Sequence, residues 1–230
     1  MPWTDQQAIR VIQYFRDKFD IKTFVETGTF MGINAKLHSN NFKEVLTCEK
    51  VDEYYKKAKE RLKDCKNVIC IHEHSPKFLH RFSDGDAKIY YLDAHFYDEN
   101  VPQDKRFVVL EELDAIGPNK KSIIIVHDFD NGLGHITYDG ISLDMDLLRS
   151  RLKKINSEFY FYTNDLASCD PVAPTVHDIE NAGLEVDKET LDNIEFAWTF
   201  PRLTYRGILY CLPKKLSDEE LTKLGLRKWN

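Results

Sequence analysis

Carboxylate and imidazole side chains follow two apolar segments of this chain, and together they could bind a cation. Asp93 ends the apolar run 89–93, and His127 and Asp128 end the run 123–128. If both runs are parallel strands of one sheet, their carboxyl ends meet at one edge, where open α/β sheets bind ligands. A mixture of carboxylate oxygen and imidazole nitrogen suits a divalent cation. We therefore predict a metal site at Asp93, His127 and Asp128.

The identity of this ion depends on His127. We predict magnesium or manganese; because magnesium prefers oxygen ligands, an imidazole ligand favours a softer ion such as manganese or iron. The alternative is that His127 acts as a base, or contacts a substrate, without any metal ion.

His95 is the residue that we predict to be the general base. It follows Asp93 by two residues, so both side chains point to the same side of an extended chain. A neutral imidazole can accept a proton from a hydroxyl group near pH 7. We predict that His95 and Asp93 are catalytic residues. Four further histidines are interpreted as structural or surface residues: His38, His80, His135 and His177.

A glycine turn follows the apolar run 23–26 and contains Gly28 and Gly32. Glycines allow a ligand to approach the backbone more closely than any side chain would permit. Glu26, at the end of the run, places a negative charge beside the turn, which favours a cationic ligand over a pyrophosphate. The pattern Gly-x-Gly-x-x-Gly of dinucleotide-binding turns is absent. We therefore predict that this turn does not bind a nicotinamide dinucleotide.

Glu49 ends a second apolar run, 45–49, about twenty residues after the glycine turn. An acidic side chain at this distance can accept hydrogen bonds from both ribose hydroxyls of a bound nucleoside. A glutamate that ends a strand is by itself most simply a solvated residue. Together with Glu26, Gly28 and Gly32, however, Glu49 predicts a cofactor that contains a ribose and carries positive charge.

Short apolar runs alternate with amphipathic segments along the first half of the chain, which predicts an α/β fold. Strands that alternate with helices at this spacing form a parallel sheet with right-handed crossovers. The predicted strands are 23–26, 45–49, 68–72, 89–93 and 123–128, and the predicted helices between them are 33–39, 52–62, 76–81 and 106–116.

The remaining segments complete a single predicted domain, 1–230. A stretch without clear periodicity, 164–205, separates two strand-like segments, and we predict that it is an insertion or a lid over the site. The other predicted elements are an N-terminal helix at 4–19 within residues 1–20, a loop at 129–142, a helix at 143–155, strands at 159–163 and 207–212, and a helix at 217–226 with a capping box of Ser217 and Glu220.

The motif Glu26-x-Gly28-x-x-x-Gly32, the acid Glu49 after the second strand and the Leu-Asp pair that ends at Asp93 resemble the class I S-adenosylmethionine-dependent methyltransferases. This resemblance implies a Rossmann-like, doubly wound, mostly parallel seven-stranded sheet whose last strand is antiparallel. It also implies that S-adenosyl-L-methionine is the cofactor.

The resemblance further implies which residues bind the cofactor. Glu26 and the backbone of Gly28, Thr29 and Gly32 are expected near its methionine part, with Asp93 close by. Glu49 is expected to hold the ribose, and His74 and Ser75 to lie near the adenine. One departure from the family motif is Phe30, which stands where its second glycine would fall.

The ionisable cluster is similar to that of metal-assisted O-methyltransferases that act on catechols and on macrolide sugars. In those families an aspartate after the fourth strand and an acidic or amide pair after the fifth hold magnesium. The resemblance thus implies O-methylation of a small hydroxylated substrate, with His127 as a departure from the family pattern. Two alternatives remain open: a metal-dependent hydrolase of the phosphoesterase type, which uses the same cluster and His95, and a non-catalytic ligand-binding domain.

Composition limits the partners and the compartment. The chain has 230 residues and a formal net charge of −6, so it lacks the basic field that sequence-independent nucleic-acid binding needs. Its five cysteines form no CxxC pair, which fits a reducing compartment. No apolar run approaches the roughly 20 residues of a membrane-spanning helix. We predict a soluble cytoplasmic protein with a small-molecule substrate, whose oligomeric state the sequence does not predict.

Overall fold

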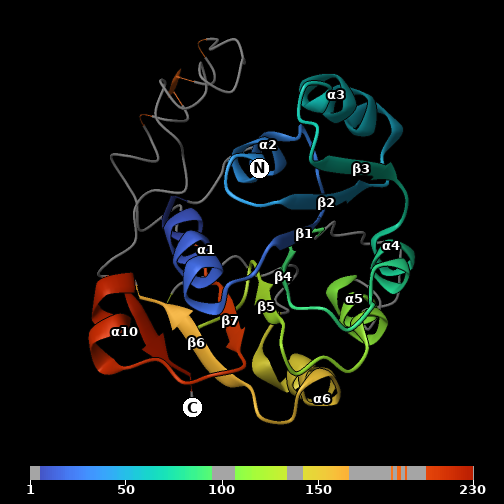
Figure 1. Ribbon diagram of the computed structural model, residues 1–230. Helices are drawn as coiled ribbons and strands as arrows, with labels where there is room; N and C mark the ends of the chain where they lie inside the picture. Colours follow the sequence, from blue (N-terminus) through green and yellow to red (C-terminus); the bar gives the residue numbers. More distant parts are fainter. Residues whose placement is uncertain are drawn as a thin grey trace.

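The computed structural model describes residues 6–94, 107–133, 142–165 and 206–229, together with 188, 191, 192 and 195. These residues form an eight-stranded sheet of order β3-β2-β1-β4-β5-β7-β6-β8 with helices on both faces (Figure 1). The strands are β1 Thr23–Thr27, β2 Glu44–Glu49, β3 Val68–His72, β4 Lys88–Leu92, β5 Ile123–Val126, β6 Tyr160–Asn164, β7 Leu209–Leu212 and β8 Leu226–Lys228.

The first five strands are parallel, and β7 is antiparallel to both β5 and β6. This confirms the predicted Rossmann-like sheet with an antiparallel strand near its C-terminal end. The predicted seven strands become eight, because β8 pairs with β6 in antiparallel orientation. The helix predicted at 217–226 also ends earlier, as α10 Asp218–Leu224, since Gly225 adopts a left-handed conformation with φ 64° that breaks the helix before β8.

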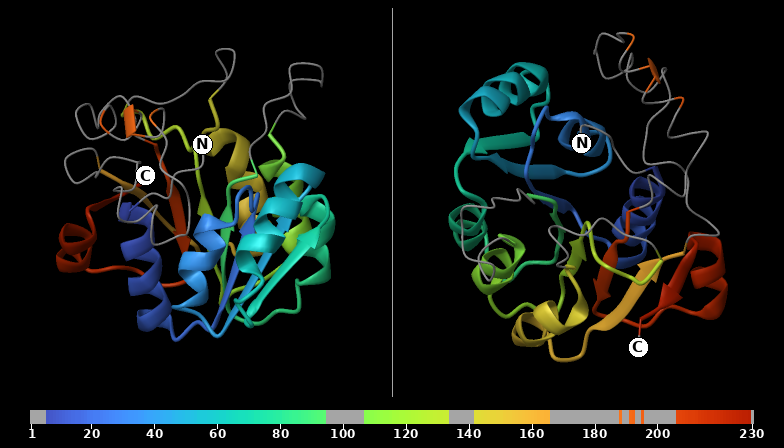
Figure 2. Two further views of the ribbon diagram at one scale, coloured as in Figure 1. Left: turned by 90° about the horizontal axis from the view of Figure 1, so that it is seen from above. Right: turned by 180° about the vertical axis from the view of Figure 1, so that it is seen from behind.

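Seven helices of the described chain cover the sheet in two layers (Figures 1 and 2). One hydrophobic cluster joins the sheet to α1, α2, α3 and α10, and a second joins its other face to α4, α5 and α6. His38 of α2 is buried in the first cluster against Phe24 and Phe42, as expected of a structural residue. The remaining helices are α1 Gln6–Phe19, α2 Ile33–Ser39, α3 Asp52–Leu62, α4 Ser75–Arg81, α5 Val109–Ile116 and α6 Met145–Ile155.

The register of the sheet brings four strand ends into one row. Thr27 of β1 pairs with Cys48 and with Leu92, and Leu92 pairs with Val126. The residues that follow therefore form the next row at the carboxyl edge: Gly28, Glu49, Asp93 and His127. Because β1 and β4 are the neighbours from which the chain winds in opposite directions, this row lies at the switch point of the sheet.

Two described residues fix the ends of the segment that was predicted as an insertion or lid. Asn164 Nδ2 donates a hydrogen bond of 2.7 Å to the carbonyl oxygen of Arg206. This hydrogen bond thus joins the last residue of β6 to the residue that follows the segment, three residues before β7 begins. Most of the segment itself lies outside the described residues, as do 134–141 of the predicted loop.

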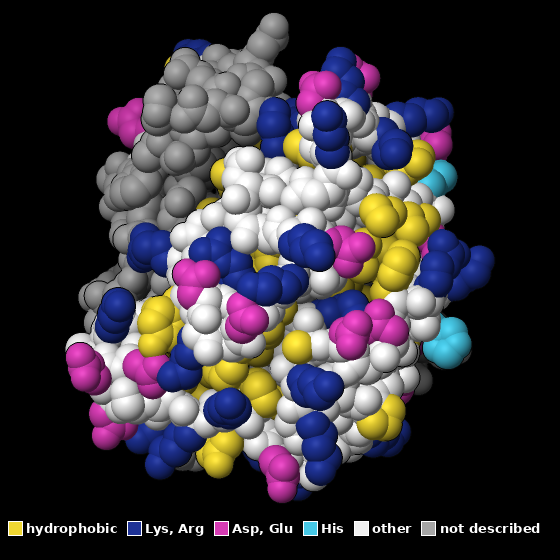
Figure 3. Space-filling view, viewed as in Figure 1, with side chains coloured by type: hydrophobic (Ala, Val, Ile, Leu, Met, Phe, Trp, Pro, Cys, Tyr) yellow, Lys and Arg dark blue, Asp and Glu magenta, His cyan; other side chains and the backbone are white. Residues whose placement is uncertain are grey.

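The described surface carries charges of both signs. On the face in Figure 3, Lys and Arg side chains are interspersed with Asp and Glu side chains. Among the described helices, none has the length and apolar character needed to cross a membrane.

Candidate functional site

Hydrogen bonds hold the turn after β1 between the ends of its two neighbouring strands. The amides of Gly28 and Thr29 both donate to the carbonyl oxygen of Cys48, at 3.1 and 3.0 Å. The amide of Asp93 donates to Thr27 Oγ1 at 3.2 Å. The glycine turn, the end of β2 and the end of β4 therefore form one connected edge.

Gly28 and Gly32 are required by the packing of the protein itself. Both have left-handed φ angles, 78° and 79°. A Cβ atom on Gly28 would lie 2.8 Å from the carbonyl oxygen of Asp93, and one on Gly32 would lie 3.2 Å from Cα of Ala58. The missing side chains of the two glycines thus make room for the backbone after β4 and for α3, and not for a ligand as predicted. A ligand would approach the outer side of the turn.

Phe30 adopts a conformation that suits the glycine expected at its position. Its φ of 48° is left-handed, which costs an L-residue roughly 1–2 kcal/mol. Its ring contacts that of Tyr54 in α3 with centroids 4.4 Å apart, and its amide donates to Glu49 Oε2 at 2.9 Å. A strained residue is therefore held beside the carboxylate predicted to bind ribose.

Glu26 is buried, with 2% of its surface exposed. Asn34 Nδ2 donates to one carboxyl oxygen at 2.7 Å and Thr47 Oγ1 to the other at 2.8 Å. Burial nevertheless raises the pKa of Glu26 to about 8. The negative charge assigned to Glu26 from the sequence is therefore largely neutralised by a proton at pH 7 in the cofactor-free protein.

Glu49 joins the glycine turn to the start of α3. Its Oε1 accepts a hydrogen bond from the amide of Val51 at 2.9 Å, and its Oε2 accepts the one from Phe30. Each carboxylate oxygen has about two acceptor positions, so one on each oxygen is left for a ligand hydroxyl. The carboxylate can thus bind two adjacent hydroxyls while it holds the turn.

His74 and Ser75 lie where β3 leads into α4. His74 is exposed and precedes the helix, whereas Ser75, its first residue, is buried. The end of β3 lies beside the end of β2, because His72 pairs with Glu49. Both residues are therefore near Glu49 in the fold, and their contact with an adenine stays a prediction.

Asp93, His127 and Asp128 converge as the sequence predicted. His127 Nδ1 lies 3.2 Å from Asp93 Oδ1 and 3.4 Å from Asp128 Oδ1. One ligand atom from each residue lies within 4.8 Å of the others. Asp128 has a left-handed φ of 55°, which is unfavourable for a residue with a side chain. This backbone strain lies within the cluster. The donor set of two carboxylates and one imidazole fits a divalent cation of the manganese or iron kind.

The protonation of His127 bears on this fit. Burial lowers the pKa of His127, but Asp93 and Asp128 together raise it by more, so that the pKa lies well above its usual value. The two carboxylates thus favour the protonated form of the imidazole. A cation that uses the imidazole nitrogen must displace this proton, which makes its affinity depend on pH.

Arg206 adds a cationic side chain to the cluster. Its side chain is 7% exposed, and its Nε lies 3.4 Å from Asp128 Oδ1. Asn164 holds this segment, because it donates to the carbonyl oxygen of Arg206 and accepts from the amide of Ile208 at 2.9 Å. In the sequence, the only feature that points to Arg206 is its place just before the last predicted strand, 207–212.

Comparison with known proteins supplies an independent view of the fold. No family model and no curated protein matches the chain. Among solved structures, a proposed O-methyltransferase from Klebsiella pneumoniae matches with a TM-score of 0.52 and 11% identity over 90% of this chain and 80% of that one. The methyltransferase domain of bacterial CtHen1 matches with a TM-score of 0.51 and 13% identity over 90% and 98%. The chain has the class I methyltransferase fold.

Within this methyltransferase fold, one predicted site residue lies outside the described chain. His95, the predicted general base, directly follows the last described residue after β4, Ala94. Its predicted role is therefore not tested by the geometry. Ala94 itself packs against Gly28, since a Cβ there would lie 2.9 Å from its Cα. The last described residue before His95 thus lies beside the glycine turn.

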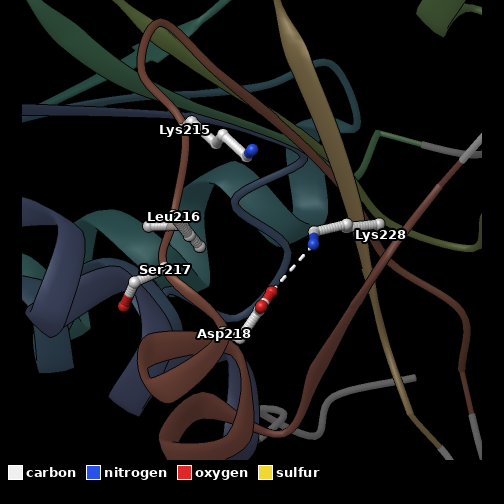
Figure 4. A pocket seen from close by; sticks show the side chains of 5 residues that line it. All are labelled: Lys215, Leu216, Ser217, Asp218 and Lys228. Atoms are coloured by element: carbon white, nitrogen blue, oxygen red, sulfur yellow. Dashed lines mark hydrogen bonds and ion pairs between the residues drawn. The ribbon is translucent and has the colours of Figure 1, made fainter.

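A surface pocket lies elsewhere in the methyltransferase fold. It is lined by residues of α10, of β8 and of the segment before α10, and it contains an ion pair of 2.8 Å between Asp218 and Lys228 (Figure 4). None of the predicted site residues lines it. The pocket therefore does not contribute to the candidate site at the carboxyl edge.

Proposed function

We propose that this protein is an S-adenosylmethionine-dependent methyltransferase that methylates an oxygen atom of a small hydroxylated molecule with the help of a divalent cation. The observation that carries the proposal is the convergence of Asp93, His127 and Asp128 next to the glycine turn. The turn supplies a place for the methyl donor, and the cluster supplies a place for the acceptor. Their contact through Gly28 and Asp93 brings the two reactants together.

The cofactor binds along the turn and the end of β2. Glu49 accepts hydrogen bonds from the ribose hydroxyls, and His74 and Ser75 lie near the adenine. The backbone from Gly28 through Thr29 to Gly32 follows the methionine part. The positive charge of the cofactor would lower the raised pKa of Glu26 and favour its ionised form.

The acceptor is held and activated at the cluster. Asp93, His127 and Asp128 would bind the cation, and this ion, when bound, would lower the pKa of an acceptor hydroxyl. Arg206 adds positive charge beside Asp128. His95 accepts the hydroxyl proton, which contributes roughly 10²- to 10⁴-fold to the rate. The cofactor, when bound, would supply the methyl group: its carbon–sulfur bond would break with the electrons left on sulfur as the bond to the acceptor oxygen forms. Positioning of the two reactants therefore supplies most of the remaining acceleration.

The class of acceptor follows from charge. The net charge of −6 and the mixed charges in Figure 3 favour a small molecule over a nucleic acid. The segment 164–205, whose ends meet at Asn164 and Arg206, acts as the insertion or lid that selects the acceptor. The protein works as a single cytoplasmic domain. No observation on the described residues favours the hydrolase alternative.

Calorimetric titration with S-adenosylhomocysteine tests the cofactor assignment. Wild-type protein is expected to bind it with micromolar affinity, and Glu49→Ala to lose at least tenfold in affinity. Lys228→Ala, in the pocket away from the site, serves as the control and should bind as wild type does. Absence of binding to wild type at high micromolar concentration contradicts the proposed function.

A further inference from the structure

We propose that Phe30 and Tyr54 form an aromatic wall that closes the ribose side of the cofactor site at Glu49 and strengthens cofactor binding. This inference rests on the proposed function, because it assumes that Glu49 binds the ribose of the cofactor. It adds two residues that neither the sequence motif nor the fold assigns to binding.

The aromatic wall lies where Glu49 joins the glycine turn to the start of α3. Phe30 belongs to the glycine turn, and Tyr54 belongs to the first turn of α3, three residues after its N-cap residue Val51. Glu49 accepts a hydrogen bond from the amide of Phe30 through one oxygen and from the amide of Val51 through the other. The two rings, 4.4 Å apart and inclined by 53°, are therefore carried by the two segments that the carboxylate joins.

Backbone strain indicates that Phe30 has a role beyond packing. A bulky residue with a φ of 48° is an outlier, and glycine would adopt this conformation without the steric cost. The gain from one aromatic contact is similar in size to that cost, so the contact with Tyr54 does not make Phe30 the more stable choice. Strained residues of this kind cluster at ligand-binding sites, where the surrounding structure holds them in place.

The aromatic wall would strengthen cofactor binding by excluding water from Glu49. Both rings are half-buried, so each retains an outer surface beside a carboxylate that is itself 8% exposed. An apolar wall next to Glu49 lowers the local dielectric constant, which strengthens hydrogen bonds from ribose hydroxyls to a charged acceptor. The wall also adds apolar area for the cofactor to cover.

Tyr55, the next residue of α3, provides a matched control. It is also half-buried, but it stacks on His72 with centroids 4.8 Å apart and packs against the core cluster. Its ring is thus engaged with β3 and not with the glycine turn. Tyr54→Ala and Tyr55→Ala remove the same group from adjacent positions of one helix.

The experiment measures the affinity for S-adenosylhomocysteine by calorimetry and the unfolding midpoint by thermal denaturation. Tyr54→Ala and Phe30→Gly are expected to weaken binding at least fivefold, with a midpoint no lower than that of Tyr55→Ala. Tyr55→Ala should keep wild-type affinity. Methylthioadenosine, which keeps the ribose and adenine but lacks the amino acid, should show the same fold loss with both variants.

The outcomes separate this inference from the proposed function. If wild type binds S-adenosylhomocysteine and both Tyr54→Ala and Phe30→Gly bind it equally well, the aromatic wall is refuted and the proposed function stands. A loss of affinity in Tyr55→Ala equal to that in Tyr54→Ala also refutes the wall, because it shows a general effect of α3. If wild type binds neither ligand, both the wall and the proposed function are overturned.

Discussion

Glu26 shows at the scale of one residue how the fold changes a side chain's chemistry. Two donated hydrogen bonds favour its charged form, yet burial is the larger effect and raises its pKa to about 8. Asp93 and Glu49 add to the rise through their charges. The residue is therefore a neutral carboxyl group in the free protein and becomes an anion when positive charge arrives.

Glu26→Gln is expected to stabilise the protein increasingly as pH rises. Between pH 4.5 and about 8 the folded state keeps a proton that the unfolded state has lost, so wild-type stability falls with rising pH. The loss of stability accumulates across this pH window and ends near the folded-state pKa. Glutamine imitates the protonated form and does not titrate. Urea unfolding at pH 5 and pH 8 checks this, and a difference between variant and wild type that is the same at both values would show that Glu26 is not protonated by burial.

Arg206→Gln is expected to bind Mn²⁺ roughly tenfold or more tightly than wild type, because a neutral side chain no longer opposes a second positive charge at Asp128. Arg206→Lys keeps the charge and should stay near the wild-type affinity. Calorimetric titration with manganese chloride measures both. Weaker binding by the glutamine variant would mean that Arg206 supports the site mainly by orienting Asp128.

At the scale of elements, the site depends on how closely β1 and β4 approach after their last paired residues. Gly28 allows this approach because a Cβ there would collide with the backbone at Asp93. Gly85 has a similar φ of 81° but no atom within 4 Å of a Cβ. The two glycines therefore separate the effect of conformation from the effect of close contact.

Gly28→Ala is expected to destabilise the protein by about 1–3 kcal/mol more than Gly85→Ala, since both pay the left-handed strain but only the former must move backbone atoms. Chemical denaturation of both variants gives the difference. Gly28→Ala should also weaken S-adenosylhomocysteine binding, while Gly85→Ala should leave it unchanged. Equal stability of the two variants would show that the turn can move away from β4 at little cost.

The sequence predicted most elements because their signals are local. Apolar runs bounded by polar residues placed β1 to β5 within about two residues of their observed limits, and the capping box of Ser217 correctly began α10. β8 was missed, because three residues cannot display an alternating pattern and only Leu226 is apolar and buried. Its pairing with β6 depends on a contact between distant parts of the chain.

At the scale of the whole molecule, the candidate site combines the ends of β1, β2, β4 and β5 with a residue that precedes β7. The convergence of Asp93, His127 and Asp128 could be predicted, since parallel strands share one carboxyl edge. The proton on Glu26 and the pairing of Arg206 with Asp128 could not, because both arise from burial by segments far apart in the sequence. Sequence spacing thus predicts which side chains meet at the site, whereas tertiary packing determines their protonation states and ion-pair partners.

A crystal structure with S-adenosylhomocysteine and Mn²⁺ tests the central claim most directly. We expect the ribose hydroxyls within hydrogen-bond distance of Glu49, and an anomalous manganese peak coordinated by Asp93, His127 and Asp128. Cofactor density away from the glycine turn, or manganese absent from the cluster at saturating concentration, would contradict the account.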